Sequence, residues 1–232
     1  MDTKLTGKTR IESDLIGARE IPAEALYGVQ TLRGIENFSI SKFRLSEYPL
    51  FIKGLAITKM AAAMANFELG LLTVEQKDAI IAACGEIIDG KHHDQFPVDM
   101  IQGGAGTTTN MNANEVIANR ALELMGHERG EYQYCSPNDH VNCSQSTNDA
   151  YPTAIHIGMY FKHLQLLPHL EELIASFRKK GEEFSRIIKM GRTQLEDAVP
   201  MTLGQTFNGF ASILQDEIAH LNEAAADFLV VN

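Results

Sequence analysis

The sequence predicts a mainly α-helical fold, with a mixed N-terminal domain over residues 1–145 and the first two long helices of a central helical bundle over residues 146–232. Two observations support this prediction. Apolar side chains recur at helical spacing in most of the chain after residue 50, and the last third holds two long stretches whose apolar positions advance by about 3.5 residues. We expect the N-terminal domain to consist mostly of short helices and loops.

The composition is that of a folded protein with an ordinary core. Of the 232 residues, 44% are hydrophobic and 22% are charged, which suffices for one or two domains. The formal charge of −10 disfavours nucleic acid and anionic membranes as partners. The N-terminus is too polar for a secretory signal, and no window approaches the ~20 apolar residues of a membrane span. We therefore expect a cytoplasmic protein that contacts neither nucleic acid nor membrane.

Neither the cysteines nor the histidines predict a metal site. Cys84, Cys135 and Cys143 lack the CxxC or Cys/His spacing of zinc ligands, so we expect reduced thiols. His92 and His93 are adjacent, and adjacent side chains diverge on any regular element. We expect no metal and no other cofactor.

The N-terminal domain is expected to begin irregularly and to continue with helices. Residues 1–45 carry glycines and a proline between short apolar pieces, which favours short strands or turns. A first helix is expected from Leu50, where the chain becomes rich in alanine and methionine. A second follows Thr73, which forms a capping box with Gln76, and ends at Gly90.

A third helix is expected from about Asn112 to Gly126, because apolar residues recur on one helical face. Two long helices follow, separated by the polar stretch KMGRTQLEDAVPM. Pro168 lies inside the first long helix, where it should remove one hydrogen bond and bend the helix. The apolar face of the third helix consists of Val116, Ile117, Ala121, Leu122 and Met125.

The two long helices cannot bury their apolar faces against each other alone, because about 30 helical residues extend roughly 45 Å. We expect further helices from other subunits or from more of the chain. The sequence stops at FLVVN within the apolar pattern, so we expect a fragment or a chain whose partner supplies the rest. The apolar positions are Ile157, Phe161, Leu164, Leu167, Leu170, Ile174, Phe177, Phe184 and Ile188, then Leu203, Phe207, Phe210, Leu214, Ile218, Leu221, Ala225 and Phe228.

Three polar segments are candidates for chemistry. The glycine-rich segment, residues 102–112, places glycines before hydroxyls and a helix start, where backbone N–H groups favour an anion. The hydroxyl-rich segment, residues 144–152, has more small polar residues than one helix cap needs, and Pro152 is expected as the first helical residue. The surplus donors could bind carboxylate oxygens. The simpler alternatives are a turn with an N-cap and a surface cap region, respectively.

The third candidate is the interhelix segment, residues 191–200, which links the two long helices. It is longer than packing requires, and Thr193 and Gln194 could direct their donors inward. Its simpler interpretation is a helix-hairpin loop.

Taken together, the three segments resemble one known family. GGAGTTTNMNANEV, SPNDHVNCSQSTNDAYPTAIHI and KMGRTQLEDAVPMTLGQ, in this order, are similar to the three corresponding regions of the class II fumarase and aspartase superfamily. IPAEALYGVQTLRGIENF extends the resemblance over essentially the whole chain. The resemblance implies a truncated L-aspartase-like fold and a homotetramer. In that assembly a central bundle of twenty helices forms, and each active site combines segments from different subunits.

Within this superfamily the chain resembles the aspartase branch. Fumarases usually have GSGTQ or GSGTS at residues 104–108, DDVN at 139–142 and SSND at 146–149, and this chain differs at each. Fumarases also have His at the position of Gln194, where many aspartases have Gln. The resemblance implies aspartate ammonia-lyase activity, the reversible elimination of ammonia from L-aspartate to give fumarate. Fumarate hydratase and a non-catalytic oligomerisation fragment remain alternatives.

The resemblance also implies residue roles. A dicarboxylate substrate would gain negative charge on its β-carboxylate during proton removal, and Thr107, Ser146 and Thr147 would donate to it. Asn148 would lie near the leaving amino group. The implied catalytic residues are Thr107, Ser146, Thr147 and Gln194, and the implied substrate-binding residues are Gly106, Asn110, Asn148 and Thr193.

Two departures from the family pattern stand out. The family base is a serine on a Gly-Ser-Ser-x-Met-Pro-Gly-Lys loop, which these 232 residues do not contain, so we expect the chain alone to be inactive. Glu196 stands where the family usually has Gln, and a carboxylate near an anionic substrate is unfavourable unless it is paired or protonated.

Overall fold

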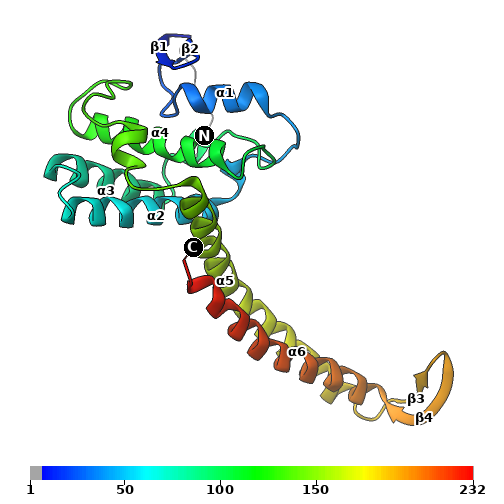
Figure 1. Cartoon of the computed structure of the whole chain (residues 1–232). Helices are drawn as coiled ribbons and strands as arrows, with labels where there is room; N and C mark the ends of the chain where they lie inside the picture. Colours follow the sequence, from blue (N-terminus) through cyan, green and yellow to red (C-terminus); the bar gives the residue numbers. More distant parts are fainter. Residues whose placement is uncertain (1–6, 232) are drawn as a thin grey trace. The chain divides into compact units, whose positions relative to one another are not determined.

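The computed structural model describes residues 7–231 and is mainly α-helical (Figure 1). Contacts group the described residues up to Met159, together with Val231, into one compact unit, and Tyr160–Val230 into a second. This division falls inside a long helix rather than at residue 145, so the expected domain boundary stays a prediction. Short helical turns within the described range are Leu45–Glu47, His93–Gln95, the π-helical Pro137–Val141 and Asp227–Leu229.

The first unit begins with an antiparallel hairpin of β1 (Thr9–Asp14) and β2 (Gly17–Pro22), followed by α1 (Val29–Asn37). The hairpin confirms the expected short strands, but α1 was not predicted. The start of α1 depends on a distant residue: the buried Glu115 side chain accepts hydrogen bonds from the backbone of Gly28, Gln30 and Thr31 at 2.8–3.0 Å. A tertiary contact therefore replaces the local cap that the sequence lacks.

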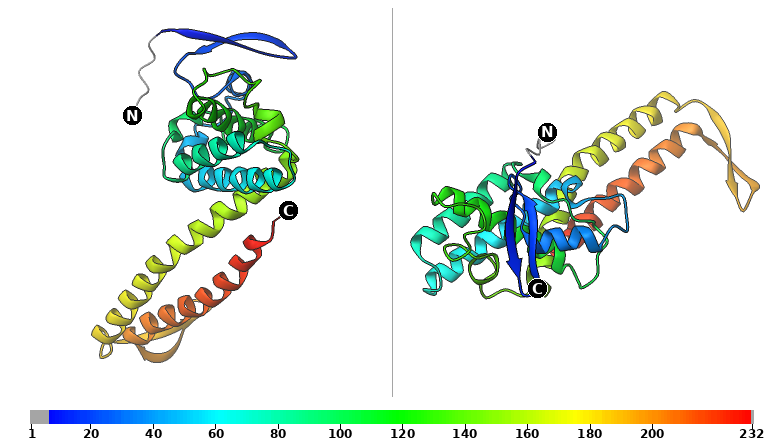
Figure 2. Two further views of the ribbon diagram at one scale, coloured as in Figure 1. Left: turned by 90° about the vertical axis from the view of Figure 1, so that its left-hand side faces the viewer. Right: turned by 90° about the horizontal axis from the view of Figure 1, so that it is seen from above.

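Two helices, α2 (Pro49–Glu68) and α3 (Val74–Ile88), pack against each other in this unit (Figure 2). The predicted capping box is present: Gln76 donates from its backbone to Thr73 Oγ1 at 3.2 Å, and Thr73 donates to Gln76 Oε1 at 3.1 Å. Gly90 has φ +90° just after the end of α3, as expected for a helix stop.

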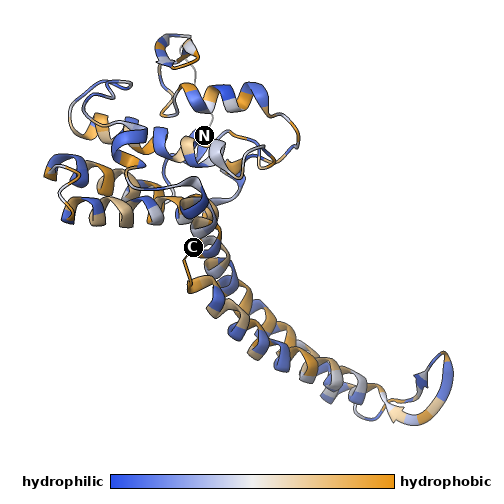
Figure 3. Cartoon of the chain, viewed as in Figure 1, coloured by the Kyte–Doolittle hydropathy of each residue, from blue (hydrophilic) through white to orange (hydrophobic). Residues whose placement is uncertain are grey.

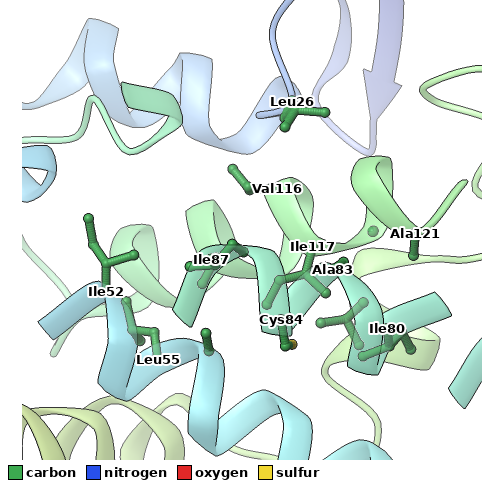
Figure 4. Packing of buried hydrophobic residues seen from close by; sticks show 14 of the residues in the cluster. Leu26, Ile52, Leu55, Ile80, Ala83, Cys84, Ile87, Val116, Ile117 and Ala121 are labelled. Atoms are coloured by element: carbon green, nitrogen blue, oxygen red, sulfur yellow. The ribbon is translucent and has the colours of Figure 1, made fainter. Parts of the chain in front are cut away.

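The core of the first unit lies between α2, α3 and α4 (Thr107–Leu124) (Figure 4). The predicted face of α4 is confirmed, since Val116, Ile117, Ala121 and Leu122 are fully buried. The helix begins five residues earlier than the expected Asn112, because the preceding glycines complete the turn. Residues from the three helices that meet in this core include Ile52, Leu55, Ile80, Ala83, Cys84, Ile87, Val116 and Ile117.

Helix α2 is long and apolar enough, by length and composition alone, to cross a membrane. The expectation that no stretch approaches a membrane span is therefore wrong for this helix. In the structure 44% of its most apolar window is buried, and Ile52, Leu55 and Ala56 are almost completely so. A position in the protein core accounts for the same composition.

Helix α5 (Thr147–Glu183) begins in the first unit and continues through Pro168. Two expectations about it are wrong. Pro152 is the sixth helical residue rather than the first, because the hydroxyl-rich segment already contributes to the helix. Ile188 lies outside α5 and opens a strand.

In the second unit, β3 (Ile188–Thr193) and β4 (Glu196–Thr202) form an antiparallel hairpin that leads into α6 (Leu203–Ala226). The interhelix segment is therefore not a simple loop. This hairpin was not predicted, because two-residue hairpin turns favour Asn-Gly and the turn here is Gln194-Leu195, with φ +49° and +68°.

The long helices of the second unit contact each other along their predicted apolar faces. The Phe177 ring of α5 contacts the rings of Phe207 and Phe210 of α6 in tilted arrangements, with ring centroids 5.9 and 5.6 Å away. Figure 3 shows apolar and polar residues alternating along both helices. Several large apolar side chains of this unit remain exposed, as expected for helices that lack part of their packing. The exposed set includes Leu164, Leu166, Leu173, Phe210 and Ile213.

Candidate active site

The glycine-rich segment contains three consecutive residues with positive φ, Gly104, Ala105 and Gly106, at +78°, +51° and +88°. Gly106 is buried against the Tyr151 ring, so a larger side chain would not fit there. Thr107 follows as the first residue of α4, and its hydroxyl donates to the Gly104 carbonyl at 2.8 Å. The backbone N–H groups of Thr107 and Thr109 already donate, to the Gly104 carbonyl at 3.2 Å and to Gln102 Oε1 at 2.9 Å. The positive end of the helix dipole still favours an anion at this helix start.

The hydroxyl-rich segment forms the start of α5. Ser144 has φ +56°, a strained conformation for a residue other than glycine. Ser146 Oγ accepts the backbone N–H of Asn148 at 3.2 Å, and Asp149 accepts the backbone N–H of Ser146 at 3.2 Å. Ser146 thus acts as a helix cap, the simpler of the two interpretations, while its hydroxyl proton remains able to donate to a ligand.

The two helix starts meet inside the first unit. The buried Asn110 donates from Nδ2 to Thr147 Oγ1 at 3.2 Å, and Gly106 packs on Tyr151. Because Thr147 Oγ1 accepts this hydrogen bond, the Thr147 hydroxyl proton can point to a different acceptor. The contact therefore brings together two N-terminal helix ends and at least one hydroxyl that is ready to donate.

A pocket of about 510 Å³ opens beside this junction. Of the predicted residues, Gly106 and Asn148 line it, whereas Thr107, Ser146 and Thr147 do not. Its other lining residues are Met100, Ile101, Gln102, Ala105, Tyr151 and Pro152.

Asp99, which was not predicted from the sequence, holds the backbone just before the glycine-rich segment. Its carboxylate accepts the backbone N–H of Ile101 and the hydroxyl of Ser41, each at 2.7 Å. It also accepts the backbone N–H groups of Ile40 and Ser41. These hydrogen bonds, that of Ile101 first, lower the pKa of Asp99 to about 2. Local sequence could not show most of these contacts, because Ile40 and Ser41, unlike Ile101, lie 59 and 58 residues away in the chain.

We expect Asp99→Asn to lower stability at pH 7, because the amide replaces an oxygen that accepts several donors. The folded pKa lies below the ordinary value of 3.8, so this stabilisation is present above pH 4 and is lost as the pH falls to about 2. Urea-unfolding midpoints of wild type and variant should therefore converge over that interval. Asp78→Asn is the control, since the Asp78 side chain is 62% exposed. A difference that stays constant from pH 7 down to the acid limit would contradict this account.

The interhelix segment lies in the second unit, so Thr193 and Gln194 belong to a different compact unit from the other predicted residues. Gln194 occupies the first turn position of the β3–β4 hairpin, and Leu195 beside it is 94% exposed. Glu196 opens β4 with an exposed side chain. The structure thus places this segment at a solvent-facing tip.

Backbone strain is concentrated in the three segments. Among residues 7–231, the non-glycine residues with positive φ are His92, Ala105, Ser144, Gln194 and Leu195. Four of these five lie in the segments selected from the sequence. Such strain persists where surrounding structure enforces it, and it is frequent at functional sites. No group of three or more His, Cys, Asp or Glu side chains within this described range could hold a metal ion.

Two helix starts rich in hydroxyl and amide donors, within a mainly helical chain, are chemically suited to bind an anion. A protein-family model described as "Lyase" matches residues 17–232. The chain belongs to this lyase family.

Comparison with individual proteins is more specific than the family model. The chain is 58% identical over 220 residues to aspartate ammonia-lyase of Pseudomonas canavaninivorans, covering 95% of this chain and 46% of that protein. It is 54% identical over 229 residues to aspartate ammonia-lyase of Escherichia coli K12, covering 98% and 48%. The chain thus spans about half the length of the curated relatives it matches.

Solved structures confirm the predicted fold class. A fumarate lyase:delta crystallin from Brucella melitensis bound to cobalt matches with a TM-score of 0.93 and 54% identity, over 97% of this chain and 49% of that one. A recombinant class II fumarase from Schistosoma mansoni matches with a TM-score of 0.88 and 37% identity, over 97% and 47%. Both belong to the superfamily that the sequence resembles.

Proposed function

We propose that the full gene product containing this chain is an aspartate ammonia-lyase, which converts L-aspartate reversibly to fumarate and ammonia. Identity of 54–58% to aspartate ammonia-lyases supports the reaction class. The observation that carries the site assignment is the hydrogen bond from Asn110 to Thr147, which joins the two helix starts. Donors from both helices can then converge on one carboxylate.

In the proposed reaction a base removes a proton from the carbon beside the β-carboxylate, and that carboxylate gains negative charge. The electron pair left by proton removal then forms the double bond of fumarate while the C–N bond breaks. The pair of that C–N bond stays on nitrogen, so the ammonium group leaves as ammonia. Thr107, Ser146 and Thr147 would donate to the charged carboxylate, as preorganised donors do at sites of developing charge. Gly106 and Asn110 would shape this donor set. Asn148 would lie near the amino group.

In the assembled protein, Thr193 and Gln194 of another subunit would complete the proposed site. The base is proposed to lie on the serine loop of the family pattern, which this chain's sequence does not contain. The chain alone is therefore expected to release no fumarate. The proposed location is the cytoplasm, with no nucleic-acid or membrane partner.

We propose a homotetramer, because the second unit leaves large apolar side chains exposed. The 232-residue chain, purified alone, should be oligomeric or prone to aggregation in light scattering. Changing Leu173 and Ile213 together to Glu should reduce this association, since their side chains are 42% and 61% exposed. Met64→Glu in the first unit, 50% exposed, is the control. A clean monomer of the unmodified chain would contradict the bundle proposal.

The direct test of the proposed function is the release of fumarate from L-aspartate by the full gene product, followed by ultraviolet absorbance. Fumarate and ammonia should appear in equal amounts, and adding ammonium to fumarate should reverse the reaction. If neither direction proceeds, the proposed function is wrong.

A further inference from the structure

A buried lysine lies directly behind the hydroxyl-rich segment. Lys59 of α2 has no exposed surface, and its Nζ donates to Asn142 Oδ1 at 2.8 Å and to Gln145 Oε1 at 3.0 Å. No carboxylate in residues 7–231 forms an ion pair with it. Burying an amine without a carboxylate is costly, so its hydrogen bonds must offset that cost.

Asn142 is the centre of this buried network. Its Oδ1 accepts hydrogen bonds from Lys59, from Asn110 at 3.0 Å and from Asn114 at 3.2 Å. Its Nδ2 donates to the backbone carbonyl of Gln145 at 3.0 Å. Asn142 thus contacts both the chain that precedes Ser146 and the Asn110 side chain.

The same Asn110 amide that donates to Asn142 also donates to Thr147 Oγ1. A continuous path therefore runs from Lys59 through Asn142 and Asn110 to the Thr147 hydroxyl. Gln145 provides a second path, because it lies one residue before Ser146 and its side chain accepts from Lys59. Both paths end at hydroxyls of the proposed carboxylate site.

We propose that Lys59 and Asn142 are positioning residues for this site: through Asn110 and Gln145 they hold Ser146 and Thr147 in the orientation that donates to the substrate carboxylate. This inference rests on the proposed function. It also explains how the strained backbone of Ser144 is maintained, since hydrogen bonds fix the chain on both sides of that residue.

The positioning depends on hydrogen bonds rather than on the charge of the lysine. Burial lowers the pKa of Lys59 to about 7, so a large fraction of the amine is neutral near that pH. A neutral amine still has two N–H groups, as many as Asn142 and Gln145 require. The path is therefore complete in either protonation state.

Lys59→Met keeps an unbranched side chain that is one atom shorter and removes both donors. We expect kcat/KM for L-aspartate to fall roughly 10- to 100-fold, mainly through kcat, because small misplacements of transition-state donors are costly. Asn142→Ser should act in the same direction, and it serves as a second variant if Lys59→Met does not fold.

The matched control is Asn112→Ala. Asn112 is a buried α4 residue whose amide donates to the Gln95 carbonyl at 3.0 Å, away from the path. This variant should lower the melting temperature without a comparable loss of kcat. An equal loss of kcat in the control and in Lys59→Met would reduce Lys59 to a general stabilising role and overturn the proposal.

Two further measurements separate this proposal from the proposed function. In the full gene product, Lys59→Met should lower kcat/KM by a smaller factor once Thr147 is changed to Ala, because only the path through Gln145 to Ser146 then remains. Fully multiplicative losses would contradict the path through Asn110. Amide hydrogen exchange of the peptide covering residues 141–150 should accelerate in Lys59→Met and stay unchanged in Asn112→Ala. Exchange requires no turnover, so it decides the positioning role even if wild type releases no fumarate. Unchanged exchange in Lys59→Met would overturn the proposal.

Discussion

Thr147→Ala in the full gene product is expected to lower kcat/KM for L-aspartate by about 100-fold or more, the usual effect of removing one transition-state donor. The Thr147 oxygen already accepts from Asn110 at 3.2 Å, so its proton is directed away from that neighbour. Alanine removes the donor while leaving the helix intact. Thr147→Ser, which keeps the hydroxyl, should retain most of the activity, and steady-state kinetics would measure both.

Thr107→Ala should cause a loss of similar size. The Thr107 hydroxyl donates to the Gly104 carbonyl in this structure, so it must rotate to donate to a ligand. Unchanged kinetics in both Thr107→Ala and Thr147→Ala would remove the site assignment. A loss in only one of them would show which helix start contacts the carboxylate.

Gly106→Ala is expected to abolish activity and to destabilise the first unit. Two costs combine: φ is +88°, where a β-carbon adds about 1–3 kcal/mol of strain, and that carbon would overlap the Tyr151 ring. Since Gly106 immediately precedes α4, relief of the overlap must move the helix starts apart. Fumarate release and thermal melting of the full gene product would measure the two effects.

Gly104→Ala separates the two costs. Gly104 has a similar φ of +78°, but the nearest atom to an added β-carbon, Thr107 Oγ1, is 3.7 Å away. This variant should therefore show the strain alone and keep more activity. Tyr151→Leu should partly restore Gly106→Ala by making room. If the Gly104→Ala and Gly106→Ala variants show the same loss of activity and the same fall in melting temperature, the overlap with Tyr151 does not contribute.

Local patterns predicted the elements whose causes are local. The Thr73–Gln76 capping box and the apolar face of α4 were read correctly, because each is encoded within a few consecutive residues. The β3–β4 hairpin was missed, since its Gln194-Leu195 turn lacks glycine and asparagine. Helix α1 was missed because Glu115, far away in the chain, caps it.

The same distinction between local patterns and distant contacts applies to the candidate site. Sequence patterns identified the three candidate segments. The glycine-rich and hydroxyl-rich segments meet in the first unit through the hydrogen bond from Asn110 to Thr147. The patterns could not reveal Lys59, which looks like an ordinary lysine in an alanine-rich helix but is fully buried. Asp99 was missed for a similar reason, because its partners Ile40 and Ser41 lie far away in the chain. Such roles depend on contacts between distant parts of the chain.

The most direct test of the central claim is the ratio of kcat/KM for L-aspartate to kcat/KM for L-malate, measured by fumarate absorbance on one preparation of the full gene product. We predict a strong preference for L-aspartate, which would support an ammonia-lyase in which Thr147 and Gln194 stand where fumarases have Ser and His. A preference for L-malate would contradict the proposal, and would show that a fumarase can carry these aspartase-like segments.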